Sequence, residues 1–289
     1  MIAESHTPRT FPSTSDNIHA ARSGTLVAEA TRRPVTLSFD FGGSNVKSAV
    51  LDHGGQTISA FIQEPVRYPF SPADMLDTIA GHALAHEVDF DRITIGMPGV
   101  IRGGKVVTTP HYICPAGPNT PASPLLADQW LGFDVRMAVE ERFGSPAIVL
   151  NDAQIAAAGV TSGYGAELVL TLGTGLGCAF VYNGQLTPHL EVSHAPGPDG
   201  RIFDDYIGEA ERLRIGDERW SEQVLSAIDA LGQVYYWDRL YVGGGNSFKL
   251  TDSTRNELLS RSMPSAGSVT FLPYESGAVG GHKVWVMQQ

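Results

Sequence analysis

Two similar units, each a strand, a glycine-rich turn and a second strand, restrict the folds open to this chain. In the first, Thr36–Leu51, an apolar run ends at Asp40, the chain turns through Gly42-Gly43, and a second apolar run follows. In the second, Glu167–Tyr182, two apolar strands flank the turn Gly173–Gly177. Glycine allows the positive φ angles of such turns and lets the backbone come close to a ligand. The repeat predicts two similar halves, each of which presents a glycine turn to a cleft between them.

The side chains beside the first turn suit a metal-bound phosphate. Asp40 precedes the turn, and the hydroxyl of Ser44 and the amine of Lys47 follow it. N–H groups that converge in a glycine turn bind anions such as phosphate, although Gly-Gly alone is typical of an ordinary hairpin. A third glycine run, Gly243–Gly245, ends another apolar strand. Because ligands gather beyond the carboxyl ends of strands in open α/β sheets, we expect all three turns to line one site.

Composition excludes several classes of protein. A chain of 289 residues with 42% hydrophobic residues can bury a large core, and its length favours two domains and hence a cleft. The net charge of −11 and the lack of a Lys/Arg run argue against a nucleic-acid-binding surface. Cys114 and Cys178 lie far apart without CxxC spacing, so we expect neither a disulfide framework nor structural zinc. The sequence has no apolar run of bilayer-spanning length and no secretion signal, which predicts a cytoplasmic protein without a membrane partner.

The order of the expected elements predicts α/β architecture. Met1–Pro34 is rich in Ser, Thr, Pro and Arg and is predicted to be a disordered tail. Two domains are expected to follow, residues 35–150 and 151–289, and the last helix can pack back on the first domain. Each domain begins with a strand meander, which in the first includes a strand at Thr57–Gln63, and continues with alternating helices and strands. One of the expected helices spans Phe203–Arg214.

Two pairs of polar residues outside the turns are candidates for catalysis or substrate binding. Asn151-Asp152 lies between an apolar strand and an Ala-rich helix, where a carboxylate can take a hydroxyl proton while the amide orients the substrate. The same pair is common as a helix N-cap, and the residues alone leave that interpretation open. Glu191 and His194 follow the second unit. An acid and an imidazole together suit vicinal hydroxyls, as on a sugar, although such residues on a loop are more often solvated.

Seven short motifs occur along the chain in a familiar order. They are Asp40-Phe-Gly-Gly-Ser-Asn-Val-Lys47, Met97-Pro-Gly99, Trp130-Leu-Gly132, Val149-Leu-Asn-Asp-Ala153, Leu172-Gly-Thr-Gly-Leu-Gly177, Glu191-x-x-His194 and Val242-Gly-Gly-Gly-Asn246. With these motifs the chain resembles the ROK sugar kinases (repressor, open reading frame, kinase) from about Val35 to Gly281. Within that family it is most similar to the polyphosphate glucokinases, which share the pattern Trp-x-Gly-x-Asp that runs from Trp130 to Asp134 and lack a cysteine-rich zinc motif.

The resemblance implies an actin-like fold of the hexokinase type, with two RNase H-like domains around a cleft. It implies a phosphotransferase that phosphorylates the 6-hydroxyl of glucose or a related hexose, with Asp152 as general base. The donor would be polyphosphate, ATP or both, with Mg²⁺ acting through Asp40 and no structural zinc. The residues implied to bind the sugar are Asn151, Glu191, His194, Gly99 and Asp204. Those implied to bind phosphate or nucleotide are Asp40, Gly42, Gly43, Ser44, Asn45, Lys47, Gly173, Thr174, Gly175, Gly243, Gly244 and Gly245.

Three positions depart from the family's pattern. Ser193 stands where the family usually has a Gly before the His. Leu125, in the proline-rich loop His111–Leu126, takes the place of an Asn that commonly contacts the sugar. Asp204 replaces a sugar-contacting Glu and is one methylene shorter. These departures leave the identity of the hexose open, and the sequence also leaves open the choice of donor.

The departures allow an alternative from another class of function. A protein could keep the fold, bind or sense a sugar, and have lost the reaction. A DNA-binding repressor is less favoured, because the tail Met1–Pro34 contains no recognition helix and the chain is acidic. The oligomeric state is also open, with a homodimer as one option.

Overall fold

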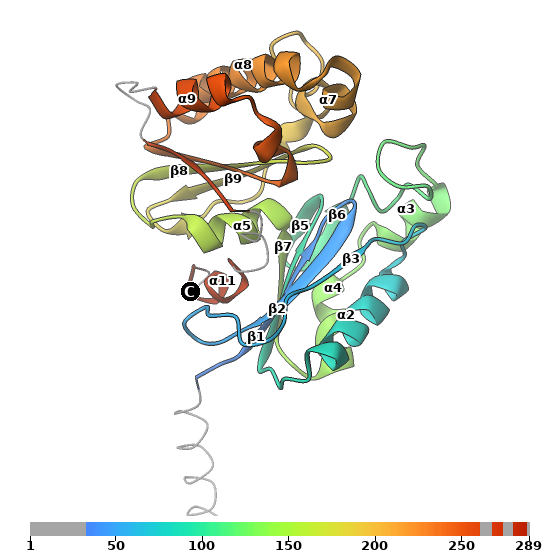
Figure 1. Cartoon of the computed structure of the whole chain (residues 1–289). Coiled ribbons are helices and arrows are strands. Elements are labelled where there is room, and N and C mark those ends of the chain that lie inside the picture. The colour runs from blue at the N-terminus through green and yellow to red at the C-terminus, as the bar shows by residue number, and fades with distance from the viewer. Residues whose placement is uncertain (1–32, 261–267, 274–279, 288–289) are drawn as a thin grey trace, which may run out of the picture. The chain divides into compact units, whose positions relative to one another are not determined.

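Two five-stranded sheets with the same strand pattern organise the structure (Figure 1). The computed structural model describes residues 33–260, 268–273 and 280–287. Both sheets belong to one compact unit, Val35–Gln289. The tail predicted at Met1–Pro34 lies, up to residue 32, outside the described residues, and the division at residue 150 stays a prediction.

The strand order repeats between the two sheets. The first sheet has the order β3-β2-β1-β4-β7 and the second the order β10-β9-β8-β11-β12. In each, three strands form an antiparallel meander and the rest run parallel to its first strand. The strands are β1 Thr36–Phe41, β2 Asn45–Leu51, β3 Ile62–Pro65, β4 Arg92–Met97, β7 Ala147–Asn151, β8 Ala166–Leu172, β9 Leu176–Tyr182, β10 Gln185–Leu186, β11 Arg239–Gly243 and β12 Val269–Phe271. A separate hairpin joins β5 (Val100–Arg102) to β6 (Lys105–Thr108). The predicted repeat of strand, turn and strand is confirmed.

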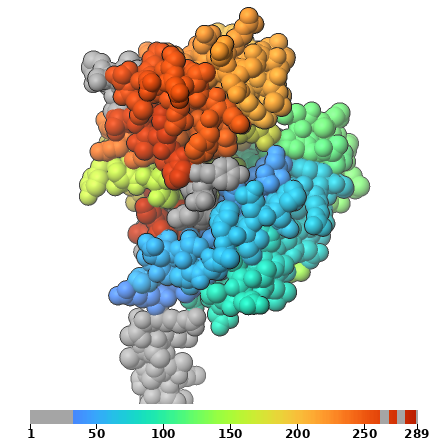
Figure 2. Space-filling model, in the orientation of Figure 1, coloured from blue at the N-terminus to red at the C-terminus, as the bar shows by residue number. Residues whose placement is uncertain are grey.

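Helices pack on the sheets, and α5 lies between the two halves (Figure 1). It contacts strands of both sheets, among them β4 of the first and β8 and β9 of the second. The helices are α2 Pro72–His86, α3 Pro124–Trp130, α4 Val135–Phe143, α5 Asp152–Val160, α6 Phe203–Ile207, α7 Glu209–Ile215, α8 Asp217–Tyr235, α9 Asp252–Ser260 and α11 Val284–Met287. In Figure 2 the orange and red surface of α8 and α9 and the blue-to-green surface of the first half occupy separate areas.

Two elements differ from the sequence-based expectation. The third strand of the first meander is Ile62–Pro65 and not Thr57–Gln63, and Thr57 forms only an isolated bridge with Leu51. The helix expected at Phe203–Arg214 breaks at Gly208, which ends α6 and precedes α7. A Cβ atom on Gly208 would collide with the carbonyl oxygen of Asp204, so only glycine fits this close approach.

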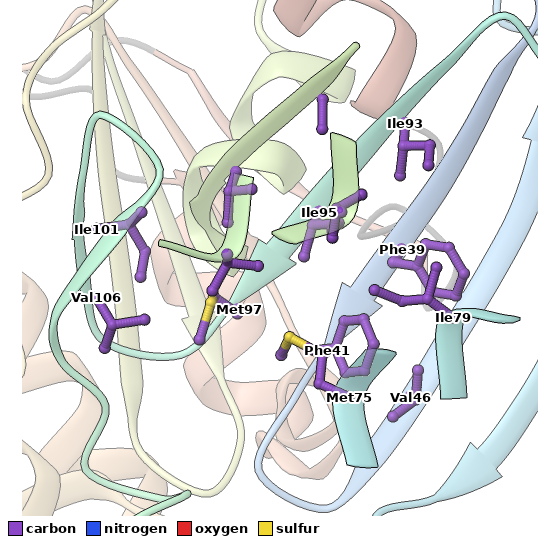
Figure 3. Packing of buried hydrophobic residues seen from close by; sticks show 14 of the residues in the cluster. Phe39, Phe41, Val46, Met75, Ile79, Ile93, Ile95, Met97, Ile101 and Val106 are labelled. Carbon is purple, nitrogen blue, oxygen red and sulfur yellow. The ribbon is translucent and has the colours of Figure 1, made fainter. Parts of the chain in front are cut away.

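Each sheet has its own apolar core. In the first, Phe39 and Phe41 of β1 pack with Ile95 of β4 and Met75 of α2, and all four side chains are buried (Figure 3). In the second, Leu168, Leu170 and Leu172 of β8 share a cluster with α8, whose Trp220 is fully buried. Nearly all residues of the central strands β1 and β8 are buried. The middle of β8 is a continuous apolar run, whereas in β1 the apolar residues alternate with Thr36, Ser38 and Asp40. Both glycine turns follow these central strands, so a packed core fixes the point where each turn begins.

The last described residues return to the first sheet. The segment η3 (Gly280–His282) contacts α5, β1 and β4. Thr94 of β4 donates its hydroxyl to the carbonyl of Gly281 at 2.8 Å, and the indole N–H of Trp285 donates to the same hydroxyl at 2.8 Å. Among the described residues, no helix combines the length and apolar character that crossing a membrane requires.

Candidate active site

A cavity of about 370 Å³ brings predicted site residues together from both sheets. Its walls include the first turn, between β1 and β2, the second turn, between β8 and β9, and the junction of β7 with α5. The predicted residues that line it are Asp40, Gly42, Gly43, Ser44, Asn45, Lys47, Gly99, Asn151, Asp152, Gly173, Thr174, Gly175, Glu191, Asp204, Gly244 and Gly245. Residues far apart in the sequence therefore face one space.

Two predicted residues do not line the cavity. His194 is exposed at the end of η1 (Val192–His194), although its charge acts on Glu191 and Asp204. Gly243 is the last residue of β11, where a Cβ atom would lie 3.1 Å from the side chain of Leu272. The glycine run therefore meets the cavity through its second and third residues.

The loop between β6 and α3 supplies a cavity residue that the sequence analysis missed. Leu125, expected in the place of a sugar-contacting Asn, is 68% exposed on α3 and does not line the cavity. His111 lines it instead, with its ring Cδ2 2.9 Å from the point where a Cβ atom on Gly43 would lie. Burial lowers the pKa of His111, with the charge of Glu191 acting in the opposite direction, so the ring is neutral near pH 7. Since its ring nitrogens make no hydrogen bond within the described part of the chain, they can serve a ligand.

Asn151 and Asp152 divide the two roles that the sequence left open for the pair. Asn151 is the N-cap of α5, since its Oδ1 accepts the N–H of Ala153 at 2.9 Å. Its Nδ2 donates to the carbonyl of Gly99 at 3.0 Å, which ties the cap to the loop after β4. Asp152 is the first residue of the helix, and its Oδ1 accepts the same Ala153 N–H at 3.0 Å. Because Asn151 supplies the cap, the carboxylate of Asp152 is available to the cavity.

Asp152 has the protonation behaviour of a general base. Burial raises its pKa to about 7, and the negative charge of Asp40 adds to the rise. The N–H of Ala153 and the charge of His189 act in the opposite direction. A carboxylate that titrates close to the working pH is both ionised and basic enough to take a proton from a hydroxyl.

Glu191 is held at both of its oxygens. Ser193 donates its hydroxyl to Oε1 at 2.8 Å, and the Nε2 atom of His189 lies 3.6 Å from Oε2. Burial by itself raises the pKa of Glu191, but the nearby His189 ring and the hydrogen bond from Ser193 outweigh it and the pKa is lowered. Glu191 is therefore a fixed, ionised acceptor. Ser193, a departure from the family's Gly, has a direct role in holding it.

The first glycine turn holds its carbonyl groups away from the cavity. The N–H of Gly42 donates to the carbonyl of Asn45 at 2.9 Å and closes the turn. The carbonyl of Gly42 accepts the hydroxyl of Tyr112 at 3.1 Å, and the carbonyl of Gly43 accepts the hydroxyl of Tyr68 at 2.7 Å. Within the described residues, the N–H groups of Gly43 and Ser44 have no acceptor.

The second glycine turn reaches the same arrangement with other partners. Its internal bond runs from the N–H of Gly173 to the carbonyl of Gly175 at 3.0 Å. The carbonyl of Gly173 accepts from Asn246 Nδ2 at 3.0 Å, and that of Thr174 accepts the N–H of Glu209 at 3.1 Å. The N–H groups of Thr174 and Gly175 have no acceptor in the described part of the chain. Unpaired N–H groups on two facing turns can bind an anion.

Asp204 supports the second turn from the side. Its Oδ1 accepts the N–H of Leu176 at 2.7 Å, and a Cβ atom on Gly175 would collide with the same carboxylate. Burial raises the pKa of Asp204, against the Leu176 N–H, which lowers it. The two turns meet through their side chains, since Ser44 Oγ and Thr174 Oγ1 lie 3.5 Å apart.

Known proteins share this sequence pattern and this fold. Residues 36–189, more than half of the chain, match the ROK family. This chain belongs to the ROK family. It is 28% identical to a polyphosphate glucokinase of Mycobacterium leprae (strain TN) over 259 residues, which are 86% of this chain and 71% of that protein.

Solved structures similar to this ROK protein include sugar kinases and a ROK family transcriptional regulator. The inorganic polyphosphate/ATP-glucomannokinase of Arthrobacter sp. strain KM matches with a TM-score of 0.71 and 22% identity, over 89% of this chain and 100% of the other. A ROK family glucokinase of Streptomyces griseus, solved with glucose and AMPPNP, matches with a TM-score of 0.65 and 19% identity, over 86% and 98%. The predicted actin-like fold and the resemblance to polyphosphate glucokinases are confirmed.

Asp40 is the acidic residue beside the first turn of this ROK protein. Its Oδ2 lies 3.8 Å from the Nζ of Lys47, and burial raises its pKa against the lowering effect of that lysine. The described residues contain no group of three or more His, Cys, Asp or Glu that could hold a metal ion by themselves. A Mg²⁺ ion that accompanies substrate phosphates needs only one or two carboxylates and keeps several waters. Asp40 therefore fits such an ion.

The cavity residues that were absent from the predicted site include His111, His189, Glu209 and Asn246. Asn246 follows the third glycine run directly, and His111 opens the long loop, so both had a weak signal in the sequence. His189 and Glu209 had none, because their importance depends on contacts with Glu191 and with Asn246 that only the fold creates.

Proposed function

We propose that this ROK family phosphotransferase transfers a phosphoryl group to the 6-hydroxyl of glucose or a related hexose, with polyphosphate, ATP or both as donor. The observation that carries the proposal is the position of Asp152 in one cavity with two turns whose free N–H groups can bind phosphate. Phosphoryl transfer needs chiefly positioning, charge stabilisation and one carboxylate that aligns the nucleophile. This cavity offers all three.

Asp152 acts as the general base. With its carboxylate ionised, it accepts the proton of the sugar hydroxyl as the oxygen attacks the terminal phosphorus of the donor. The bond from that phosphorus to the bridging oxygen breaks, and ADP or a shortened polyphosphate leaves. Burial, with a smaller contribution from the charge of Asp40, keeps the pKa of Asp152 high, so the proton is held well once it has moved. The cap made by Asn151 fixes the first turn of α5 and with it the direction of the carboxylate.

The N–H groups of Gly43, Ser44, Thr174 and Gly175 stabilise the charge on the transferred phosphoryl group. Hydrogen-bond donors that are oriented in advance cost no reorganisation during the reaction. The hydroxyls of Ser44 and Thr174 add donors from both sides. Asp40, with Lys47 next to it, would hold the Mg²⁺ ion that neutralises negative charge on the donor. Gly243–Gly245 would flank the nucleotide when ATP is the donor.

Asn151, Glu191, Gly99 and His111 form the sugar side. Glu191 accepts from hydroxyls, and the neutral ring of His111 can donate to one and accept from another. His194 reaches the sugar only if the halves close further, as lids and domains do in many kinases. The hydrogen bond from Leu176 supports a different role for Asp204, that of holding the second turn.

A matrix of sugars and donors tests the proposal. Purified protein with Mg²⁺ is incubated with glucose, mannose, other hexoses and N-acetylated hexoses, each with ATP and with polyphosphate, and sugar phosphate is measured. We expect a hexose 6-phosphate from at least one pairing. If no pairing yields a sugar phosphate, and glucose still raises the melting temperature, the protein is a sugar-binding protein that has lost the reaction.

A further inference from the structure

Two tyrosine hydroxyls support the first glycine turn from behind. Tyr112 donates to the carbonyl of Gly42 at 3.1 Å and Tyr68 to the carbonyl of Gly43 at 2.7 Å. Neither tyrosine lines the cavity, and Tyr112 is fully buried. They come from different segments, Tyr68 from the stretch between β3 and α2 and Tyr112 from the loop between β6 and α3.

The geometry of the peptide bond links these carbonyls to the free N–H groups. In a trans peptide the C=O of one residue and the N–H of the next lie in one plane and point in opposite directions. A carbonyl of Gly42 held outward by Tyr112 therefore turns the N–H of Gly43 inward. In the same way, the bond from Tyr68 to the carbonyl of Gly43 turns the N–H of Ser44 inward. These are the two N–H groups of the turn that have no acceptor in the described residues.

We propose that Tyr68 and Tyr112 are positioning residues for the phosphoryl donor, and that their hydroxyls orient the two peptide planes that bind its phosphate. This inference rests on the proposed function for the identity of the donor. The tyrosines touch neither substrate, and their effect passes through the glycine backbone. Glycine has the widest choice of backbone conformations, so a Gly-Gly turn needs such external support to keep one of them.

The surroundings of Tyr68 and Tyr112 keep their hydroxyls protonated, so both hydrogen bonds to the turn persist across the working pH range. Burial raises the pKa of both phenols, and nearby ionisable groups, which include Cys114 for Tyr68 and Asp152 for Tyr112, raise it further. Both therefore stay protonated and keep a hydrogen to donate. The rings also have their own packing, since Tyr112 lies 4.9 Å from Phe70 and 5.3 Å from Trp130 between ring centroids. Removing only the hydroxyl leaves that packing in place.

The test uses Tyr68→Phe, Tyr112→Phe and the double variant, with Tyr241→Phe as matched control. Tyr241 donates its hydroxyl to Glu167 at 2.9 Å, is mostly buried, and does not line the cavity. KM and kcat are measured for the donor at saturating sugar and for the sugar at saturating donor. We expect each single variant to raise the donor KM roughly 5- to 50-fold while the sugar KM changes less than about twofold. Tyr241→Phe should keep both KM values.

A second measurement does not need turnover. Tripolyphosphate should raise the melting temperature of the unmodified protein, and the rise should be smaller in the double variant but not in Tyr241→Phe. If the unmodified protein turns over no sugar, the proposed function fails, and this measurement still decides the inference. Equal shifts in the unmodified protein, the double variant and Tyr241→Phe would overturn it. Variants that change the donor and sugar KM equally, or that only lose kcat in step with melting temperature, would also overturn it, because a merely structural role has those effects.

Discussion

The first glycine turn is held by two phenol hydroxyls, whereas the second is held by an amide, a backbone N–H and a carboxylate. Tyr112 and Tyr68 bind the first pair of carbonyls, and Asn246 and the N–H of Glu209 bind the second pair. In each turn the next two N–H groups are left without an acceptor in the described residues. What the halves share is the orientation of two peptide planes, and unrelated side chains produce it.

The two supports differ in how they respond to charge. Both phenols of the first turn stay neutral, because their pKa values are raised. The second turn depends in part on Asp204, which can ionise, and on Asn246, which also binds Glu209 in its ion pair with Arg212. We therefore expect the second turn to be the more sensitive to substitution and to pH.

The largest effect on activity is expected from substitution of Asp152, whose carboxylate shares the cavity with both glycine turns. Asp152→Ala should lower kcat on the order of 10²–10⁴-fold, since the base is lost while the phosphate turns remain. In the unmodified protein kcat/KM should fall as the pH drops below about 7, because the raised pKa of Asp152 leaves it protonated there. Steady-state kinetics across pH measures both effects.

The control for this variant is its stability. The folded protein holds a proton on Asp152 that the unfolded chain releases, so between the ordinary pKa near 3.8 and about 7 this group lowers stability as the pH rises. At pH 8 the Ala variant should therefore melt no lower than the unmodified protein. If Asp152→Ala keeps its activity, Asp152 has only a structural role at the N-terminus of α5.

The next largest effect is expected from substitution of Asn246, whose side-chain amide supports the second glycine turn. Asn246→Ala removes the donor to the carbonyl of Gly173 and should lower kcat/KM for the phosphoryl donor roughly 10- to 100-fold. The loss should exceed that of Tyr112→Phe, since Asn246 also ties Glu209 to the turn. Parallel kinetics on the two variants compare the turns directly. Equal losses would remove the expected asymmetry.

Substitution of Asp204 tests whether this residue supports the second glycine turn or contacts the sugar. Asp204→Ala removes the acceptor for the N–H of Leu176 and should raise the donor KM about 5- to 20-fold, with little change in the sugar KM. Asp204→Asn is the matched variant, because its amide oxygen can still accept that bond, and it should recover most of the loss. A rise confined to the sugar KM would mean that Asp204 contacts the sugar and does not support the turn.

The smallest effect is expected outside both turns. Leu125→Asn, which restores the residue type common in the family, should change the sugar KM less than about twofold and the free energy of unfolding by less than about 0.5 kcal/mol. The side chain is exposed on α3 and does not face the cavity. His111→Ala in the same assay should raise the sugar KM. A large gain from Leu125→Asn would mean that the loop moves when sugar binds.

Most of the fold and much of the site could be predicted from local patterns. The repeated strand–turn–strand units, the cap at Asn151 and the residues of the two turns all follow from short stretches whose chemistry is visible in the sequence. The break at Gly208 was not predicted, because it depends on the close approach of the Asp204 carbonyl. Tyr68 and Tyr112 were also missed, since nothing near them in the sequence indicates which carbonyls they meet. Leu125 was expected at the position of a sugar-contacting Asn, but it does not line the cavity. A proline-rich loop without periodicity does not indicate which of its residues faces the site.

The contact between Ser44 and Thr174 has a consequence for how the two substrates influence each other. The two hydroxyl oxygens lie 3.5 Å apart across the line where the halves meet. A phosphoryl group that takes donors from both turns must enter between them, so donor affinity depends on the spacing of the halves. By linkage, a sugar that changes this spacing changes donor affinity, and the donor changes sugar affinity by the same factor. The contact between Ser44 and Thr174 thus couples the binding of the two substrates.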